Sequence, residues 1–322
     1  MSALKIIHIT PTPLVGAPGK IAWAQRMKGH NALAVALSDY PQKGPLANKF
    51  LDKILLLNDF TTAYIEEYIS TANVIHIHNY FPNNKLSWIT RLNQSALFVY
   101  QVHSPLREGP LYVDRGSYDS LINFRVRLVV GQYLGRLYPS YLPVPNLILS
   151  PPSVTLREPG ERLKVMFSPT HSHVGRWTSK NSNVLNDVLE SLKSLGKIEI
   201  IKPQSFISPE TLFEVRRGCH VTIDEITTGG FHQVSLEGLC AGNIVINRAD
   251  YFAKTTFGNF CDGVPPPFTY ADESTIGSAI ECLAENYEDS NRLQKFNYDY
   301  FQKYCDPIRL VEVFDAAYQR AL

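Results

Sequence analysis

The chain has 322 residues, of which 44% are hydrophobic, and 31 lysines and arginines nearly balance 30 aspartates and glutamates. This length suits two average domains, and the composition excludes a disordered or fibrous protein. A formal net charge of +1, without any cluster of basic residues, argues against a nucleic-acid partner. No uninterrupted apolar run is long enough to predict a membrane-spanning helix.

The N-terminal residues lead directly into an apolar stretch, without the basic region and cleavage site of a signal peptide. An odd number of cysteines follows in the second half, without a CxxC pair; they are Cys219, Cys240, Cys261, Cys282 and Cys305. Both observations favour reduced thiols and a cytoplasmic protein.

Strands and helices are expected to alternate along the first half. Runs rich in Ile, Leu and Val predict strands at Lys5–Ile9, Ala32–Leu37, Lys53–Leu57, Val74–His78, Ala96–His103 and Arg127–Val130. A helical pattern covers Thr61–Ser70, with Asp59 as its expected cap. The alternation predicts a parallel sheet built from βαβ units.

A proline-rich stretch from Tyr138 to Ser153 separates the two halves. Because proline can neither continue a helix nor donate to a central strand ladder, this stretch is predicted to be a linker. We expect one domain at residues 1–150, a second at 151–305, and a C-terminal helix within residues 306–322.

The same alternation resumes in the second half. Strands are predicted at Leu163–Phe167, Ile198–Ile201, His220–Ile226 and Ile244–Asn247. Helices are predicted between them, one ending at Gly196, one beginning after Ser208, and one at Gln233–Ala241 that ends at Gly242. In open sheets of this class, ligands bind outside the carboxyl ends of the strands. We therefore expect the function to lie at the strand-to-helix turns of both halves.

The segment from Thr228 to Ile246 is the strongest candidate binding site. Its two glycines allow a ligand to approach the backbone, and the amides of the next turn could hold a phosphate at a helix N-terminus. A carboxylate one turn later could accept two sugar hydroxyls. The expected ligand-binding residues are Gly229, Gly230, Phe231, His232, Gln233 and Glu237. A tight turn before a helix is the alternative reading of the glycine pair.

This segment resembles the donor motif of the retaining group 1 glycosyltransferases (glycosyltransferase family 4). Glu237-Gly-Leu-Cys-Ala-Gly-Asn-Ile-Val-Ile matches the family pattern Glu-Ala-Met-Ala-x-Gly-x-Pro-Val-Ile without a gap. The resemblance implies the α/β GT-B fold, in which two Rossmann-like domains with parallel sheets face a central cleft. The chain departs from the family at Gly229, where a second glutamate is usual. Asp224 and Glu225 are the nearest substitutes for it, and a solvated strand end is their alternative reading.

An upstream segment, from Phe167 to Asn181, resembles the loop where the family places an arginine and a lysine on the donor diphosphate. Lys180 matches the lysine and Arg176 the arginine, and Thr170 would contact the donor. Cations fixed in a water-poor site stabilise the charge that develops on a departing diphosphate. A solvated surface pair is the alternative reading of these two side chains.

In the first half, Gly16 follows the first predicted strand. The resemblance implies that backbone amides here touch the donor phosphate and the acceptor, although an ordinary turn also fits. His103 ends another strand and matches the family histidine that meets the donor sugar at the reacting centre; a packed or loop histidine is the alternative. The loop at Pro105–Ser117 would suit acceptor binding, or be a variable surface loop.

His76 and His78 share one face of a predicted strand, because side chains alternate along it. His78 lies nearer the carboxyl end and is expected on the acceptor side, whereas His76 is expected to be buried. Two histidines at this spacing could suggest a metal, but no further ligand cluster in the sequence supports one.

The resemblance thus implies a metal-independent, retaining transfer of a sugar from a nucleoside diphosphate sugar to a hydroxyl of a glycan, glycolipid or small molecule, as in polysaccharide biosynthesis. No cofactor, metal or nucleic acid is expected. A lipid-linked acceptor would require peripheral contact with the inner face of the membrane. The resemblance also implies that the C-terminal helix, about Pro307–Arg320, packs back on the first domain. The alternatives are a non-catalytic nucleotide-sugar-binding protein and another GT-B enzyme, such as a sugar-nucleotide epimerase. The donor base, the sugar, the acceptor and the oligomeric state stay open.

Overall fold

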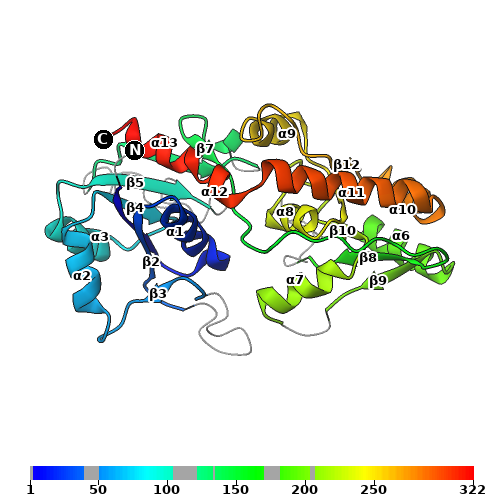
Figure 1. The fold of residues 1–322 in the computed structure, drawn as a ribbon, viewed down its shortest axis with the longest axis horizontal. Coiled ribbons are helices and arrows are strands. Elements are labelled where there is room, and N and C mark those ends of the chain that lie inside the picture. The colour runs from blue at the N-terminus through cyan, green and yellow to red at the C-terminus, as the bar shows by residue number, and fades with distance from the viewer. Residues whose placement is uncertain (1–2, 40–50, 104–121, 133–134, 170–181, 204–206) are drawn as a thin grey trace. The chain divides into compact units, whose positions relative to one another are not determined.

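A computed structural model describes residues 3–39, 51–103, 122–132, 135–169, 182–203 and 207–322. The chain forms two compact units (Figure 1). Unit 1 consists of Met1–Leu147 together with Pro307–Leu322, and unit 2 consists of Ile148–Asp306. Within the described ranges, no helix is both long and apolar enough to span a bilayer.

Unit 1 contains a seven-stranded parallel sheet in the order β3-β2-β1-β4-β5-β6-β7. The strands are β1 (Lys5–Thr10), β2 (Asn31–Ala36), β3 (Leu55–Leu56), β4 (Val74–His78), β5 (Leu97–Val102), β6 (Val126–Val130) and β7 (Leu142–Val144). The order in which successive strands are added to the sheet reverses between the parallel neighbours β1 and β4. Their register pairs His8 with His76. A reversal of this kind is where ligands bind in open α/β sheets, at the carboxyl ends of the two strands.

The last strand, β7, lies in the stretch that the sequence predicted to be a linker, so that prediction was wrong for these residues. Leu142 and Val144 pair with β6 as the final strand of the sheet, and the amide of Gly131 donates to the carbonyl of Val144 at 3.0 Å. Pro143 is tolerated because an edge strand does not need every amide for its ladder.

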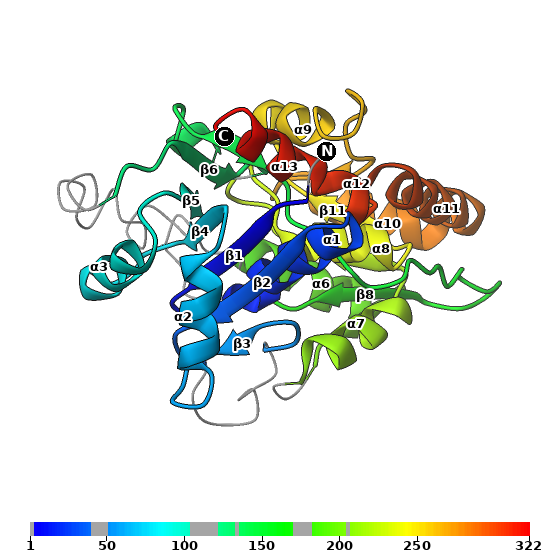
Figure 2. The ribbon, with the colours of Figure 1, turned by 60° about the vertical axis from the view of Figure 1, so that its left-hand side comes forward.

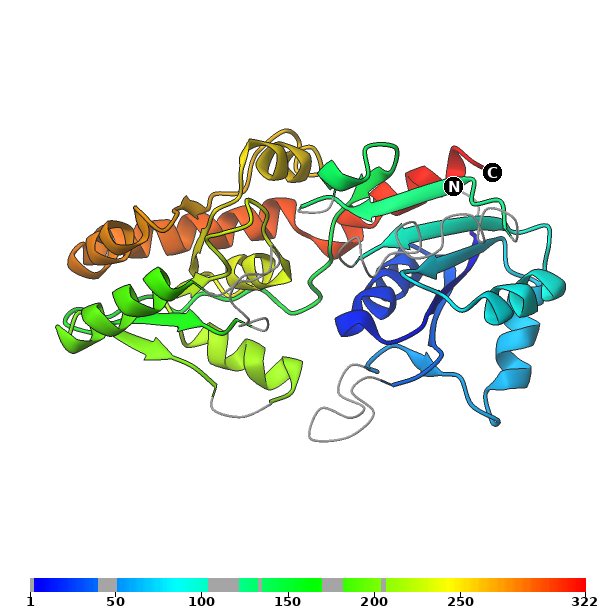
Figure 3. The same cartoon turned by 180° about the vertical axis from the view of Figure 1, so that it is seen from behind.

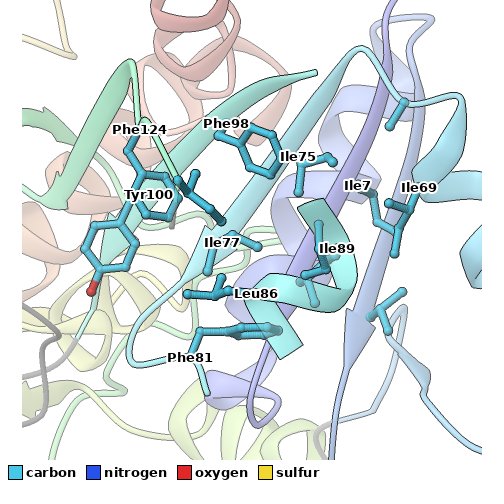
Figure 4. Packing of buried hydrophobic residues seen from close by; sticks show 14 of the residues in the cluster. Ile7, Ile69, Ile75, Ile77, Phe81, Leu86, Ile89, Phe98, Tyr100 and Phe124 are labelled. Carbon is cyan, nitrogen blue, oxygen red and sulfur yellow. The ribbon is translucent and has the colours of Figure 1, made fainter. Parts of the chain in front are cut away.

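The two faces of this sheet carry different side chains. One face packs on α2 (Thr62–Ser70) and α3 (Asn83–Leu92) through an apolar cluster that includes Ile77, Leu86 and Ile89 (Figure 4). Because side chains alternate along a strand, His8, His76 and His78 point to the opposite face.

The opposite face is covered by α1 (Ala17–Met27), which lies along β1 and β2 (Figure 2). The C-terminal segment also packs on unit 1 (Figure 3). It forms two helices, α12 (Pro307–Leu310) and α13 (Glu312–Gln319), in place of the single helix that was expected. They contact α1 and β7 respectively.

Asp59 does not cap α2: the N-cap residue is Thr61, which makes no side-chain capping hydrogen bond. In the turn before the helix, the side-chain oxygen of Asn58 accepts hydrogen bonds from the amides of Phe60 and Thr61 at 3.0 and 3.1 Å.

Unit 2 contains a five-stranded parallel sheet in the order β12-β11-β10-β8-β9. The strands are β8 (Leu163–Phe167), β9 (Ile198–Ile201), β10 (Val221–Ile223), β11 (Ile244–Asn247) and β12 (Thr269–Tyr270). The helices are α6 (Asn183–Ser194), α7 (Pro209–Arg217), α8 (Gln233–Cys240), α9 (Tyr251–Gly258), α10 (Ile276–Glu285) and α11 (Tyr287–Tyr304). Strand order reverses between β8 and β10, which places this unit's expected ligand position at their carboxyl ends.

In unit 2, α6 and α10 contribute to the apolar cluster on one side of the sheet, while α8 packs on β10 and β11 and α11 packs on α8 and β11. The approach of α8 to the sheet requires Gly238, because a Cβ there would lie 2.8 Å from the Val245 side chain and 3.1 Å from that of Thr222. A glycine therefore follows Glu237 where the family motif has alanine. All five cysteines are free thiols.

Candidate functional site

The loop after β10 is built around two buried carboxylates, Asp224 and Glu225. One oxygen of Glu225 accepts from the amides of Thr227 and Thr228 at 2.7 Å each, and its other oxygen accepts from the Thr228 hydroxyl at 2.8 Å. The reading of these acids as a solvated strand end was therefore wrong. Both carboxylate oxygens of Glu225 are thus hydrogen-bonded to the loop that leads to α8.

Asp224 binds the start of α8 itself. Its Oδ2 accepts from the amide of His232 at 2.5 Å and from the hydroxyl of Ser235 at 2.8 Å, and its Oδ1 lies 3.2 Å from His232 Nδ1. The expectation that the His232 amide is open to a ligand was therefore wrong. In the part of the chain that the structure describes, no group accepts from the amides of Gln233 and Val234. These two amides carry the helix N-terminal positive potential that attracts anions.

Phe231 has a structural role that the sequence did not predict. Its side chain is fully buried and packs edge-to-face against Phe257 and Phe268, with ring centroids 5.4 and 4.9 Å away. Gly229 has a φ of +81°, which side-chain-bearing residues rarely adopt. A glycine at this position is therefore required by the backbone turn. The amide of Gly230 donates to the Thr228 hydroxyl at 3.3 Å.

Glu237 lies one helical turn after Gln233 and is held by two donors. Gln233 Nε2 donates to its Oε1 at 2.8 Å, and Arg216 Nη2 lies 3.1 Å from its Oε2. The Glu237 side chain is 21% exposed, whereas that of Arg216 is 3% exposed. Gln233 and the buried Arg216 therefore orient the carboxylate, and Arg216 balances its charge. The carboxylate keeps an accessible side that can accept further hydrogen bonds.

Arg216 was not singled out from the sequence. It also donates to the Thr222 hydroxyl at 3.3 Å, beneath α8. An arginine in a sequence of mixed charge on a predicted helix carries no local signal of burial. Only the packing of α7 beside β10 and α8 brings it to Glu237.

In unit 1, the loop between β1 and α1 is strained. Leu14, Val15 and Gly16 follow one another with φ of +48°, +55° and +78°. Positive φ is costly for a β-branched residue such as Val15, and strain of this kind clusters at functional sites. Gly16 is the N-terminal cap residue of α1, at the carboxyl end of β1 where the sequence predicted contact with a ligand.

The two candidate histidines of unit 1, His78 and His103, lie in one hydrogen-bonded chain. His103 Nε2 lies 2.8 Å from His78 Nδ1, and His78 Nε2 lies 3.0 Å from His8 Nδ1. His8 Nε2 in turn lies 2.8 Å from Gln25 Oε1. His103 is partly exposed at the carboxyl end of β5, and its amide donates to the side chain of Asn79 at 2.8 Å.

The imidazoles in this hydrogen-bonded series are neutral at pH 7. Burial lowers the pKa of His8 to about 4 and that of His103 to about 3. Burial, followed by repulsion from neighbouring imidazoles, also holds the pKa of His76 and of His78 well below the usual range. A neutral histidine has one N–H donor and one lone-pair acceptor. Each ring therefore donates a hydrogen bond to one neighbour and accepts one from the other.

His8 adds a third imidazole to the pair that the sequence singled out, so the statement that no further ligand joins them was wrong. Nitrogens of His8, His76 and His78 lie within 4.8 Å of one another. The rings of His76 and His78 are stacked, with centroids 4.1 Å apart and an interplanar angle of 19°. A metal binds a ring nitrogen in the ring plane, and stacked rings direct those lone pairs side by side. This geometry favours a hydrogen-bonded network over a ligand set; that the protein needs no metal stays a prediction.

His76 is fully buried, as expected, and its Nδ1 lies 2.7 Å from the hydroxyl of Tyr318 on α13. The remaining predicted site residues, Thr170, Arg176 and Lys180, lie outside the described residues, as does the predicted acceptor loop at Pro105–Ser117.

Comparison with known proteins places this arrangement among glycosyltransferase folds. No protein-family model matches the sequence, and no match was found among curated proteins. Among solved structures, a glycosyltransferase from Rickettsia africae ESF-5 is similar with a TM-score of 0.59 at 14% identity, over 100% of this chain and 99% of that one. An alpha-glucosyltransferase in complex with UDP and a 13-mer DNA containing a HMU base gives 0.61 at 12% identity, over 99% and 100%. A UDP-forming alpha,alpha-trehalose-phosphate synthase from Burkholderia xenovorans gives 0.56 at 9% identity, over 99% and 99%.

At such low identity the likeness establishes the fold. The chain has the α/β GT-B fold, with Rossmann-like units that contain parallel sheets of seven and five strands. The expectation from the donor motif is confirmed at the level of the fold.

Proposed function

We propose that this chain is a retaining glycosyltransferase that moves a sugar from a nucleoside diphosphate sugar to a hydroxyl acceptor without a metal. The observation that carries the proposal is the start of α8. Two amides without an acceptor among the described residues, those of Gln233 and Val234, lie one turn before the partly exposed carboxylate of Glu237. Phosphate oxygens suit the amides, and the two ribose hydroxyls suit the carboxylate.

In the proposed reaction, the bond between the sugar's anomeric carbon and the diphosphate breaks, and the acceptor oxygen forms the new bond on the same face. The acceptor's proton passes to the departing phosphate oxygen, so no carboxylate nucleophile is required. Lys180 and Arg176 would stabilise the diphosphate, and His103 would meet the donor sugar. Two of the similar structures are named for UDP, as a bound ligand or as a product, which supports a nucleoside diphosphate as the leaving group.

Calorimetry with UDP, GDP and ADP tests the donor site. We expect one of them to bind, and Glu237→Gln to weaken that binding about tenfold or more, because a hydrogen bond to a charged group contributes roughly 1.5–3 kcal/mol. Glu214→Gln is the matched control, since its carboxylate is 64% exposed on α7 of the same unit. Absence of binding by all three nucleotides refutes the proposal.

A non-catalytic nucleotide-sugar-binding protein is the second candidate. The turn at Gly229 favours it, because the family's second glutamate has no equivalent there and the Glu225 carboxylate is already occupied by the loop. Slow release of free nucleotide from one donor sugar distinguishes an enzyme from a binder. Lys180→Ala is expected to abolish that release with the fold retained, and unchanged turnover would refute the role of Lys180.

A further inference from the structure

Beyond His8, the hydrogen-bonded series of unit 1 continues through Gln25 to the carboxylate of Asp315, whose oxygens accept and so set its direction. The amide of Leu4 donates to His30 Nδ1 at 3.1 Å. Because a backbone amide can only donate, His30 Nδ1 is a lone-pair acceptor, and Nε2 is the ring nitrogen that carries a proton. That nitrogen lies 3.3 Å from Asp315 Oδ2 on α13, with both side chains buried.

Gln25 transmits this direction from Asp315 to His8. Gln25 Nε2 donates to Asp315 Oδ1 at 3.1 Å, and its Oε1 lies 2.8 Å from His8 Nε2. Turned the other way, the amide would place its oxygen against a carboxylate oxygen. The amide therefore presents an acceptor to His8, and the single proton of His8 is on Nε2.

The remaining protons follow one by one. His8 Nδ1 must accept, so His78 donates from Nε2 across 3.0 Å. His78 Nδ1 must then accept, so His103 donates from Nε2 across 2.8 Å. His103 Nδ1 consequently carries a lone pair, and any group that contacts it must donate a hydrogen bond.

We propose that Asp315 and Gln25 are positioning residues that, through His8 and His78, fix the proton of His103 on Nε2 and make its Nδ1 a hydrogen-bond acceptor. Any group that meets this nitrogen must donate a hydrogen bond to it, as a hydroxyl group does and a phosphate oxygen cannot. The part of this inference that concerns turnover rests on the proposed sugar transfer; the tautomer itself does not.

The same helix also supports the ring planes. Tyr318, one turn after Asp315, lies 2.7 Å from His76 Nδ1, and the His76 ring stacks on that of His78. Asp315 and Gln25 are 290 residues apart in the chain. The C-terminal segment thereby completes a network that begins in β1 and α1 and ends at His103.

The tautomers can be read directly by long-range ¹H–¹⁵N correlation on protein labelled at histidine, with the signals assigned by single His→Gln variants. At pH 7.5 we expect His8, His78 and His103 all to carry the proton on Nε2. Burial raises the pKa of the Asp315 carboxyl, and a protonated Asp315 with a turned Gln25 would reverse the chain. A proton on Nδ1 of His103 in the wild-type protein is therefore the result that would overturn the proposal.

Variants show whether the network sets the tautomer. Asp315→Asn retains an acceptor toward Gln25 and should keep the Nε2 proton on His103. Asp315→Leu, and independently Gln25→Met in case the first does not fold, should produce a mixture of tautomers. Where transfer is measured, both should lower kcat about tenfold or more, because a misplaced group at the reacting centre raises the barrier, and this loss should exceed any change in KM for the donor. Unaltered tautomers in folded Asp315→Leu and Gln25→Met would contradict the proposal.

Glu312→Gln is the matched control. It removes a charge from the same helix, where Glu312 pairs with Lys28 and is 58% exposed, without touching the network. It should alter neither tautomer nor kcat; an equal change in this variant would assign the effect to helix charge and overturn the proposal. Failure of nucleotide binding would refute the transferase function while leaving the tautomer result intact, so the two proposals fail separately.

Discussion

The carboxyl ends of the two sheets share a topology and differ in chemistry. At the reversal of strand order in unit 1, neutral imidazoles occupy the face under α1 and α13. At the equivalent reversal in unit 2, two buried carboxylates bind the loop and start of α8. The comparison shows that one fold presents two kinds of site. Unit 1 presents imidazoles that are hydrogen-bonded to one another, and unit 2 presents two helix-terminal amides that have no acceptor among the described residues.

The largest expected difference between the two units is in how much stability each loses in acid. His8, His76 and His78 are fully buried, and burial lowers the pKa of His8 to about 4 and holds the pKa values of His76 and His78 well below the usual range. Below pH 6.5 these histidines bind protons in the unfolded chain but stay neutral in folded unit 1. The stability of unit 1 is therefore full above pH 6.5 and is lost as pH falls. From pH 6.5 to 5 His8 alone removes about 2 kcal/mol, and His76 and His78 act in the same direction.

Among the described residues of unit 2, His220 is the comparable group: burial lowers its pKa to about 4, and it should remove about 2 kcal/mol over the same range. Hydrogen exchange measured by mass spectrometry at several pH values follows each unit separately. His220→Gln should remove the dependence in unit 2 and leave unit 1 unchanged. Equal acid loss in both units would contradict the contrast.

The second prediction concerns Phe231, which lies inside the proposed donor segment but packs into the core. Phe231→Ala should lower the free energy of unfolding of unit 2 by about 3–5 kcal/mol, because it removes a buried ring and leaves a cavity. Denaturant unfolding measures this. Phe296→Ala, at a 58% exposed ring on α11, should stay within about 0.5 kcal/mol. A Phe231→Ala protein of normal stability that no longer binds nucleotide would assign the ring to the ligand instead.

Glu225→Gln tests whether the carboxylate holds the loop. An amide supplies one acceptor oxygen where the carboxylate supplies two, so a donor of Thr227 or Thr228 loses its partner, at a cost of about 2 kcal/mol. Exchange of those two amides should accelerate. Glu214→Gln, at an exposed carboxylate of the same unit, provides the comparison. Unchanged protection of the two amides would show that Glu225 does not organise the loop.

The smallest effect is expected at Gly229. An alanine there must adopt a φ near +81°, which costs roughly 1–2 kcal/mol. Gly277 lies in α10, where a Cβ would meet the Val188 side chain at 3.7 Å, an ordinary contact. Gly277→Ala should therefore be neutral or stabilising by up to about 1 kcal/mol. Thermal unfolding of the two variants compares them directly, and equal values would exclude a backbone requirement at Gly229.

Much of the fold follows from local pattern. The strands at Val74–His78, Leu163–Phe167 and Ile244–Asn247 have the predicted bounds, because near-continuous β-branched and aliphatic runs fit strands covered on both faces. The strand at Leu142–Val144 was missed because proline argues against strands in general, and only its place at the sheet edge makes it acceptable.

The candidate site was predictable in part. The alternation of side chains along a strand placed His76 and His78 on one face. The four-residue spacing placed Gln233 and Glu237 on one side of a helix. The buried partners of these residues were not predictable. His8 reaches His78 through the register of β1 against β4, and Arg216 reaches Glu237 through the packing of α7.

The sequence by itself determined the alternating α/β architecture and the position of the donor-like motif, because both are written in residue periodicity and spacing over short stretches. Tertiary structure alone decided which atoms of that motif are accessible, and it joined His103 to Asp315 across more than half of the chain. The physical reason is that hydrogen-bond direction and burial depend on side chains from separate elements. Those elements meet only when the sheet and its covering helices pack together.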